Sequence, residues 1–409
     1  MAVTSESGRR SDVVVVGAGP AGLATSRHLS MLGVGHVVLE RDEVGATWRS
    51  ERWDSFHLVT PAWSVRLPGL DLSAHDPDEF LSRTDIIHML DRYARLTKAP
   101  VRTHVEVRAV RRDGDSFVLM TSEGEWSARA VVVASGPLRL PRVPAIALPT
   151  GVAGVHAIDY RRPDQLAPGA VLVVGSGQSG VQIADELRRA GRTVFLATSA
   201  VGRVPRRYRG RDVFVWLREL GLLEQSREKT PEEVRRAPQV AVSGSGGGRT
   251  MALQQLARDG ITLLGKLVGA DGARFRLAGD LAHNMKAADD FAARFRAQID
   301  RHLGAETPGD VDPVEAPLGY EPASPTELDA ATAGIGSVVW CTGMRPDTGW
   351  LPADVVDPSG TPEQHDGALA LPGLFVVGLP WQTHRGSGIL YGMATDAADV
   401  ASQISNYLG

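Results

Sequence analysis

The sequence contains almost no cysteine. Among its 409 residues there is one, Cys341, and a single thiol forms neither a disulfide framework nor a CxxC redox pair. The same scarcity argues against a cysteine-based zinc site, because such sites need several thiolates. We therefore expect no metal centre.

Excess charge and long apolar runs are also missing. The formal net charge of −4 argues against a nucleic-acid partner. No apolar run is long enough to cross a membrane, and the polar start, MAVTSESGRR, lacks the apolar core of a secretion signal. We expect a cytoplasmic protein with no membrane contact and a disordered tail over residues 1–10.

Two glycine-rich loops are the most informative feature of the chain. GAGPAG at 17–22 follows the apolar run DVVVV, and GSGQSG at 175–180 follows AVLVV. In such a loop the three glycines allow a tight turn, close approach to a pyrophosphate and close helix–strand packing. The phosphates lie at the helix N-terminus, where free N–H groups favour negative charge. One loop alone also occurs as a ligand-free turn, but two indicate two dinucleotides exchanging electrons.

The residues after each loop distinguish the two ligands. HVVLE ends in Glu40, close to the offset at which an acid binds the ribose hydroxyls of FAD or NAD. After the second loop, TVFLA runs into TSAVGRVPRRYRGR, with no acid before Asp212. Arginines there can bind a 2′-phosphate, although a solvated basic face is the simpler interpretation of any one of them. The sequence predicts FAD at the first loop and NADPH at the second.

The order of elements predicts an α/β fold of two Rossmann-like dinucleotide-binding domains, each three-layered, with the NADPH domain inserted into the FAD domain. We expect the FAD domain over 11–155 and 335–409 and the NADPH domain over 156–334. A glycine-rich segment at 242–250 is predicted to be a flexible loop, and the role of the proline-rich excursion at 306–334 stays open.

Further motifs, in this order, resemble the class B flavoprotein monooxygenases, the group of flavin-containing, Baeyer–Villiger and N-hydroxylating monooxygenases. They are GATWR at 45–49, VASG at 133–136, VHAIDYR with His156 and Tyr160, WCTG at 340–343, and LPGLFVVG followed by SGIL up to Leu390. Two positions differ from the family pattern. Val152 stands where the signature normally has glycine, and Val59 where many members have asparagine.

The resemblance implies a mechanism and a set of residues. NADPH reduces FAD, a C4a-(hydro)peroxyflavin forms with O2, and one oxygen atom passes to a small organic substrate by N- or S-oxygenation, Baeyer–Villiger or related oxidation. The residues expected at FAD and at the domain links are Gly17, Gly19, Pro20, Ala21, Gly22, Glu40, Arg41, Thr47, Trp48, Arg49, Val105, Ala134, Gly136, Thr342, Gly343, Gly378, Ser387, Gly388, Ile389 and Leu390. Those expected at NADPH are Gly175, Ser176, Gly177, Gln178, Ser179, Gly180, Thr198, Ser199, Arg203 and Arg207.

Candidates near the reaction centre are His57, His384 and Arg385, because a cation there could stabilise an oxygen anion. For His57 a packed structural role is an equal alternative, and Arg385 could simply pair with a carboxylate. The substrate pocket is expected among the loops at 57–67, 208–222 and 381–391. A flavin reductase without oxygen insertion and a nucleotide-binding sensor remain alternatives. The oligomeric state stays open, with a homodimer considered.

Overall fold

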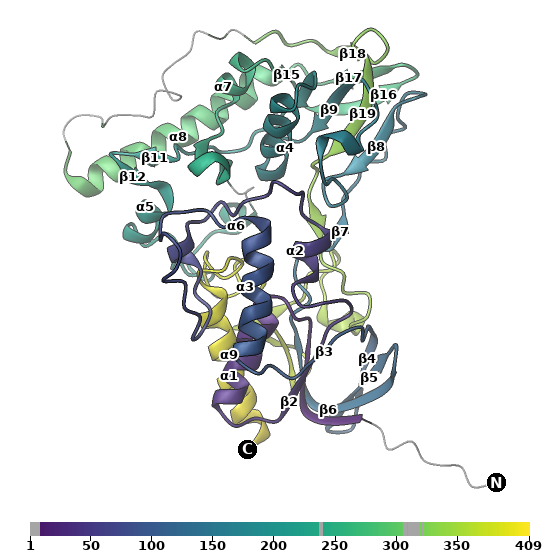
Figure 1. Cartoon of the computed structure of the whole chain (residues 1–409), viewed down its shortest axis with the longest axis vertical. Helices are drawn as coiled ribbons and strands as arrows, with labels where there is room; N and C mark the ends of the chain where they lie inside the picture. Colours follow the sequence, from purple (N-terminus) through teal and green to yellow (C-terminus); the bar gives the residue numbers. More distant parts are fainter. Residues whose placement is uncertain (1–8, 237–239, 306–308, 310–319, 321) are drawn as a thin grey trace.

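Two parallel sheets, each entered through one of the glycine loops, organise the chain. The computed structural model describes residues 9–236, 240–305, 309, 320 and 322–409. The two sheets follow one another along the long axis of the molecule, with helices packed beside each (Figure 1).

The first sheet has the order β21-β22-β23-β6-β1-β2-β3, and β4 and β5 extend it from β6. In its centre β1 runs parallel to both β2 and β6, and Val13 to Val16 of β1 are buried, as expected for a strand covered on both faces. The strands are β1 (Arg9–Val16), β2 (His36–Leu39), β3 (Val101–Arg102), β4 (Val107–Asp113), β5 (Ser116–Thr121), β6 (Gly124–Val133), β21 (Gln364–His365), β22 (Ala368–Leu369) and β23 (Leu374–Val376).

Helices α1 (Pro20–Met31), α3 (Arg83–Leu96) and α9 (Met393–Leu408) cover one face of this sheet, and side chains of β4 and β5 pack on the other. Helix α3 starts in a capping box, in which the hydroxyl of Ser82 and the carboxylate of Asp85 each accept a backbone N–H of the other residue. The short α2 (Ala46–Ser50) lies beside α3.

The second sheet is parallel throughout and has the order β15-β10-β9-β19-β8. Its strands are β8 (Ala153–His156), β9 (Ala170–Val174), β10 (Val194–Ala197), β15 (Thr262–Leu264) and β19 (Ile335–Trp340). One face packs on α4 (Gln178–Arg189), α7 (Leu253–Arg258) and α8 (Leu281–Leu303), and the other on β16 (Leu267–Asp271) and β17 (Arg274–Leu277), which pairs with β18 (Glu327–Asp329).

The chain crosses between the two halves twice, and the crossings lie side by side. Strand β7 (Leu140–Pro141) of the outward crossing pairs antiparallel with β20 (Met344–Arg345) of the return. The excursion after β10 carries β11 (Arg207–Tyr208), β12 (Arg211–Asp212), α5 (Val213–Glu219), α6 (Glu232–Arg236), β13 (Val242–Ser243) and β14 (Arg249–Thr250). Within the described residues no helix is both long enough and apolar enough for a bilayer crossing.

Several expectations about local structure were wrong. Arg9 and Arg10 do not belong to a tail, because β1 begins at Arg9 and both pair with β6; the rest of the predicted tail lies outside the described residues. The segment 242–250 is a hairpin, with Val242 paired to Thr250. Strand β19, expected in the first half, belongs to the second sheet, where burial on both faces suits its apolar run. Most of 306–321 lies outside the described residues.

Candidate functional site

Both glycine loops have the same backbone geometry. The first glycine of each has a positive φ, 108° at Gly17 and 106° at Gly175. A Cβ added there would lie 2.6 Å from the carbonyl oxygen of Ala134 or 2.5 Å from that of Cys341. Only glycine fits these turns.

The other two glycines of each loop differ in what surrounds them. A Cβ at Gly22 or Gly180 would lie 1.9 Å or 1.8 Å from the carbonyl oxygen of the first glycine, so the helix is packed against the turn. At Gly19 and Gly177 a Cβ would meet no protein atom within 4 Å. These two residues are the N-caps of α1 and α4, and no side chain caps either helix. Each loop therefore presents uncapped N–H groups to open space, which fits a dinucleotide pyrophosphate.

Glu40, directly after β2, is oriented toward the first loop. One carboxylate oxygen accepts the N–H of Ala18 at 2.7 Å and the other that of Asp42 at 3.0 Å, and the residue is 9% exposed. A carboxylate beside the glycine loop suits a ribose with free hydroxyls. Arg49 faces elsewhere, because Asp91 holds its guanidinium at 2.6 Å.

The other residues expected at FAD differ in which of their groups are left for a cofactor. Trp48 of α2 packs edge-on against Phe56 at 5.8 Å, and the guanidinium of Arg52 lies over its ring. Thr47 precedes Trp48 in the same helix. Val105 donates its N–H to the Glu40 carbonyl, which leaves its own carbonyl for adenine. These contacts with a cofactor stay predictions.

Acids hold most of the arginines expected at the 2′-phosphate. Arg207 is exposed, and the described residues show no ion pair for it. The arginines that do form ion pairs are Arg203 with Asp289, Arg206 with Asp212, Arg209 with Asp300 and Arg211 with Glu219. The predicted phosphate contact therefore rests on Arg207.

Thr198 and Gln178 use their side chains inside the fold. The Thr198 hydroxyl donates to the Leu264 carbonyl at 2.7 Å and accepts from Asn284. The Gln178 amide bonds both the N–H and the carbonyl of Val242, which ties the 242–250 hairpin to the second loop. Only the backbones of Thr198 and Gln178 are left for a nucleotide. The hydroxyl of Ser176 likewise bridges to the backbone of Ser199.

The links predicted between the halves meet at His156. Its Nε2 donates to the Gly343 carbonyl at 3.1 Å, while its Nδ1 accepts the N–H of Ile158. Burial lowers the pKa of His156, so this neutral pattern is favoured. Four residues on from His156, the Tyr160 hydroxyl donates to Glu186, which also accepts the hydroxyl of Ser55. The two residues therefore hold the crossing in place.

The C-terminal loop expected at the flavin folds around a buried hydroxyl. Ser387 is fully buried, and its oxygen accepts the N–H groups of Thr383 and His384. Gly378 has φ 94°, and a Cβ there would touch Ala21 of the first loop at 2.8 Å. The structure therefore places the start of the loop at 378–390 beside the first glycine loop, and the contact of this loop with a cofactor stays a prediction.

A segment from the second half lies along this loop, which the sequence did not reveal. Leu223 and Gln225 accept the N–H groups of Gly386 and Arg385, and Arg227 donates its own N–H to the Thr383 carbonyl. Their pairing resembles an added strand, with an antiparallel bridge at 226–384. Its residues carry no motif, so sequence gives no signal for it.

The three candidate catalytic residues do not form one cluster. Within the described residues, no recorded contact joins His57 to the C-terminal loop; it bridges to Ser82 at the start of α3. His384 Nδ1 lies 3.0 Å from the Leu223 carbonyl. Arg385 lies over the Trp381 ring, and burial lowers its pKa. The loops at 57–67, 208–222 and 381–391 do converge, since Arg218 lies over the Trp63 ring and Trp63 packs edge to face against Tyr391.

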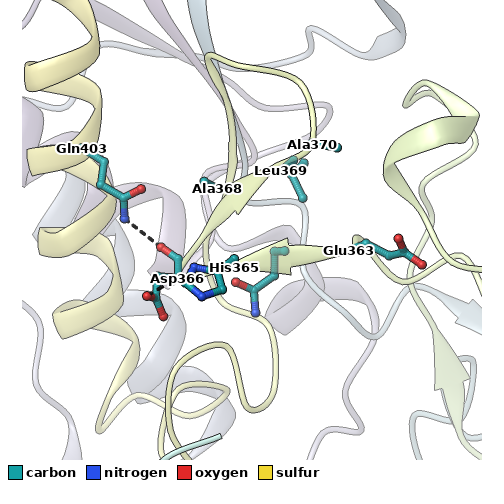
Figure 2. Close-up of a pocket in the computed structure, with 8 residues that line it drawn as sticks. Glu363, His365, Asp366, Ala368, Leu369, Ala370 and Gln403 are labelled. Atoms are coloured by element: carbon teal, nitrogen blue, oxygen red, sulfur yellow. Dashed lines mark hydrogen bonds and ion pairs between the residues drawn. The ribbon is translucent and has the colours of Figure 1, made fainter. Parts of the chain in front are cut away.

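A surface groove of about 570 Å³ lies elsewhere, between strands β21 and β22 and helix α9. Figure 2 shows its polar side chains, including the Gln403 amide that donates to the Asp366 carbonyl. It contains none of the predicted site residues and is not the candidate site.

Comparisons with known proteins agree with this arrangement. A family model described as pyridine nucleotide-disulphide oxidoreductase matches residues 14–219. An uncharacterized oxidoreductase named CzcO-like, from Geobacillus kaustophilus, is 30% identical over 97% of this chain and 99% of its own length. The chain belongs to the pyridine nucleotide-disulphide oxidoreductase family. The probable indole-3-pyruvate monooxygenase YUCCA1 of Arabidopsis thaliana is 32% identical over 49% of this chain and 50% of its length.

Solved structures share the fold of this oxidoreductase. A flavin-containing monooxygenase from Stenotrophomonas maltophilia aligns with a TM-score of 0.67 and 22% identity, covering 98% of this chain and 100% of the other. The structure of OTEMO in complex with FAD and NADP aligns with a TM-score of 0.57 and 17% identity, covering 97% and 85%. The predicted two-dinucleotide α/β fold and the resemblance to class B flavoprotein monooxygenases are confirmed.

Proposed function

We propose that this oxidoreductase binds FAD at 17–22 and NADPH at 175–180, and that it transfers one oxygen atom from O2 to a small organic substrate. The observation that supports this proposal is the geometry shared by the two glycine loops. Both helices begin at an uncapped glycine that faces open space, at Gly19 and at Gly177. Two such cradles in one chain suit an electron donor and an electron acceptor.

Bound FAD and NADPH would supply the redox chemistry, and the chain's residues position the reactants. Glu40 would hold the adenosine ribose, and Arg207 the 2′-phosphate. Ser387 fixes the loop beside the first cradle, and the segment at 223–227 covers that loop from the second half. Such covering excludes water from the reaction. Asp396 accepts the Thr383 hydroxyl, and burial raises the pKa of this carboxyl group.

Isotope labelling tests the proposal. The purified FAD-loaded protein is given NADPH, ¹⁸O2 and three probes that differ in reactive atom: methyl phenyl sulfide, N,N-dimethylaniline and phenylacetone. We expect one ¹⁸O atom in the product of at least one probe, with one NADPH consumed for each product molecule. NADPH oxidation with no label in any product overturns oxygen insertion.

A disulfide reductase is the second candidate, because the family's name includes that activity. The chain itself speaks against it. Burial raises the pKa of the single thiol, Cys341, to about 12, and disulfide exchange needs a thiolate. Anaerobic, multiple-turnover reduction of a small disulfide such as 5,5′-dithiobis(2-nitrobenzoate) by NADPH would establish this second function instead.

A further inference from the structure

Two arginines beside the candidate site lie on aromatic rings. The guanidinium of Arg66 lies 4.0 Å from the ring centroid of Tyr391, and that of Arg218 lies 4.4 Å from that of Trp63. In the described ranges, neither arginine forms an ion pair with a carboxylate. Stacking holds the guanidinium plane while leaving its N–H edge able to donate.

The two stacks belong to one cluster. Trp63 and Tyr391 pack edge to face, with centroids 6.2 Å apart and an angle of 89°. Burial raises the pKa of Tyr391, while Arg66 and Arg218 both oppose that rise. The two arginines therefore lie on the two rings of one aromatic pair.

The nearby acids have other partners. Glu219 accepts a hydrogen bond from each of the two terminal nitrogens of Arg211, and Glu224 accepts the Tyr391 hydroxyl. The corner formed by Trp63, Tyr391 and the two arginines on their rings therefore holds two positive charges. Among the described residues, its one acid without an arginine partner, Glu224, is hydrogen-bonded to a hydroxyl. An incoming anion would meet net positive charge there.

The same corner also offers apolar surface and one more donor. Val59, Leu217 and Leu220 pack there, partly buried, against the same hydrophobic cluster as Trp63. The indole Nε1 of Trp63 is buried and has no hydrogen-bond partner. A buried donor without a partner is costly, and a ligand oxygen would satisfy it.

This corner borders the loop expected at the flavin. Arg66 donates its backbone N–H to the Leu390 carbonyl at 3.0 Å, and Tyr391 directly follows Leu390. Three segments distant in sequence contribute: Arg66 from the segment between α2 and α3, Arg218 from α5 and Tyr391 from the loop before α9. A molecule held here would lie next to the predicted reaction centre.

We propose that Arg66 and Arg218 bind the carboxylate of an organic acid whose aromatic body lies along Trp63 and the neighbouring apolar side chains. This inference rests on the proposed function, because it names the substrate class of that site. Arginine suits the role, since its planar N–H fork matches two carboxylate oxygens. Both arginines are exposed, so an anion reaches them without rearrangement of the fold.

Binding by the FAD-loaded protein tests the inference independently of turnover. The probes are phenylacetate, phenylpyruvate and indole-3-acetate, and phenylacetamide and indole-3-acetamide serve as uncharged counterparts. Dissociation constants come from isothermal titration calorimetry at low and high salt. We expect at least one acid to bind more than tenfold more tightly than its amide or, for phenylpyruvate, than phenylacetamide, and this preference to shrink as salt is raised.

Charge-removing variants locate the contact. Arg66→Gln and Arg218→Gln should each weaken binding of that acid at least tenfold and leave its amide within twofold, while Arg66→Lys recovers part of the loss. Arg108→Gln is the matched control, because Arg108 is a similarly exposed arginine of β4, paired with Glu106. All variants should unfold at the temperature of the parent.

The outcomes separate the inference from the proposed function. Equal affinity for acids and amides, no binding by any of the three acids, or unchanged binding in both glutamine variants overturns the carboxylate site. A carboxylate preference that depends on both arginines, in a protein that inserts no ¹⁸O, keeps the site and refutes the oxygenation.

Discussion

Alanine substitutions at the second and third glycines of the first loop should have opposite effects on folding and on FAD. A Cβ at Gly22 would lie 1.9 Å from the Gly17 carbonyl oxygen, and relief to the 3.4 Å of ordinary contact requires an opening of about 1.5 Å between turn and helix. At Gly19 the φ is −78° and a Cβ meets nothing within 4 Å. The apoprotein should tolerate alanine there.

The magnitudes follow from these distances. Overpacking in Gly22→Ala should lower the free energy of unfolding by about 3 kcal/mol. Since Tm changes by about 2–4 °C per kcal/mol, the Tm of the apoprotein should fall by roughly 6–12 °C. Gly19→Ala should change apoprotein stability by less than about 1 kcal/mol. Its methyl group would hold the pyrophosphate away from one or two N–H donors, worth about 3 kcal/mol together, so the Kd for FAD should rise roughly 100-fold.

Two assays on the same preparations check this contrast: thermal unfolding of the apoprotein, and FAD content from the ratio of flavin to protein absorbance. Gly177→Ala and Gly180→Ala are the matched pair for the second loop, read out through NADPH affinity. Full FAD retention in a stable Gly19→Ala protein would refute the assignment of the first cradle. An unchanged Tm in Gly22→Ala would refute the steric reasoning.

Three further predictions concern charged and titrating groups. Arg207→Gln should raise the KM for NADPH at least tenfold and that for NADH less than twofold in steady-state assays, whereas Arg203→Gln, which breaks a pair with Asp289, should lower the Tm. Burial lowers the pKa of His156 in the folded protein. Its contribution to the free energy of unfolding should therefore be fully present above the unfolded pKa of about 6.5 and decline as the pH falls below it. Urea unfolding at several pH values should show a shallower decline in His156→Gln. Arg206→Met should lower the free energy of unfolding by about 3–5 kcal/mol, because it leaves Asp212 buried and unpaired. Urea unfolding should show that adding Asp212→Asn recovers most of this loss.

The sequence predicted the parts of the site that lie in local patterns. Each glycine loop sits between an apolar strand and a helix, so its geometry depends on neighbours a few residues away. Glu40 lies at a fixed offset within the same βαβ unit and was predictable for the same reason. The resemblance also predicted a role for Gly378, which the structure places beside Ala21, whereas the cofactor contact expected at 387–390 stays a prediction.

The rest depends on long-range packing that leaves no local pattern. Nothing near Arg203 shows that Asp289 of α8 holds it, so its availability could not be judged from the sequence. The glycines of 242–250 suggested a flexible loop. In the structure Gly244 packs so closely that a Cβ there would lie 1.8 Å from the Leu58 carbonyl oxygen. Glycine here permits close packing, not mobility. The domain limits expected from the sequence stay a prediction, although β19 shows that the return crossing begins after residue 340.

The paired crossings have a consequence for proteolysis. Strands β7 and β20 lie antiparallel and bond to each other, and the 223–227 segment joins the halves a third time. A protease that cuts one crossing leaves two connections intact. The nicked protein should therefore elute as a single species under native conditions and release its fragments only in denaturant.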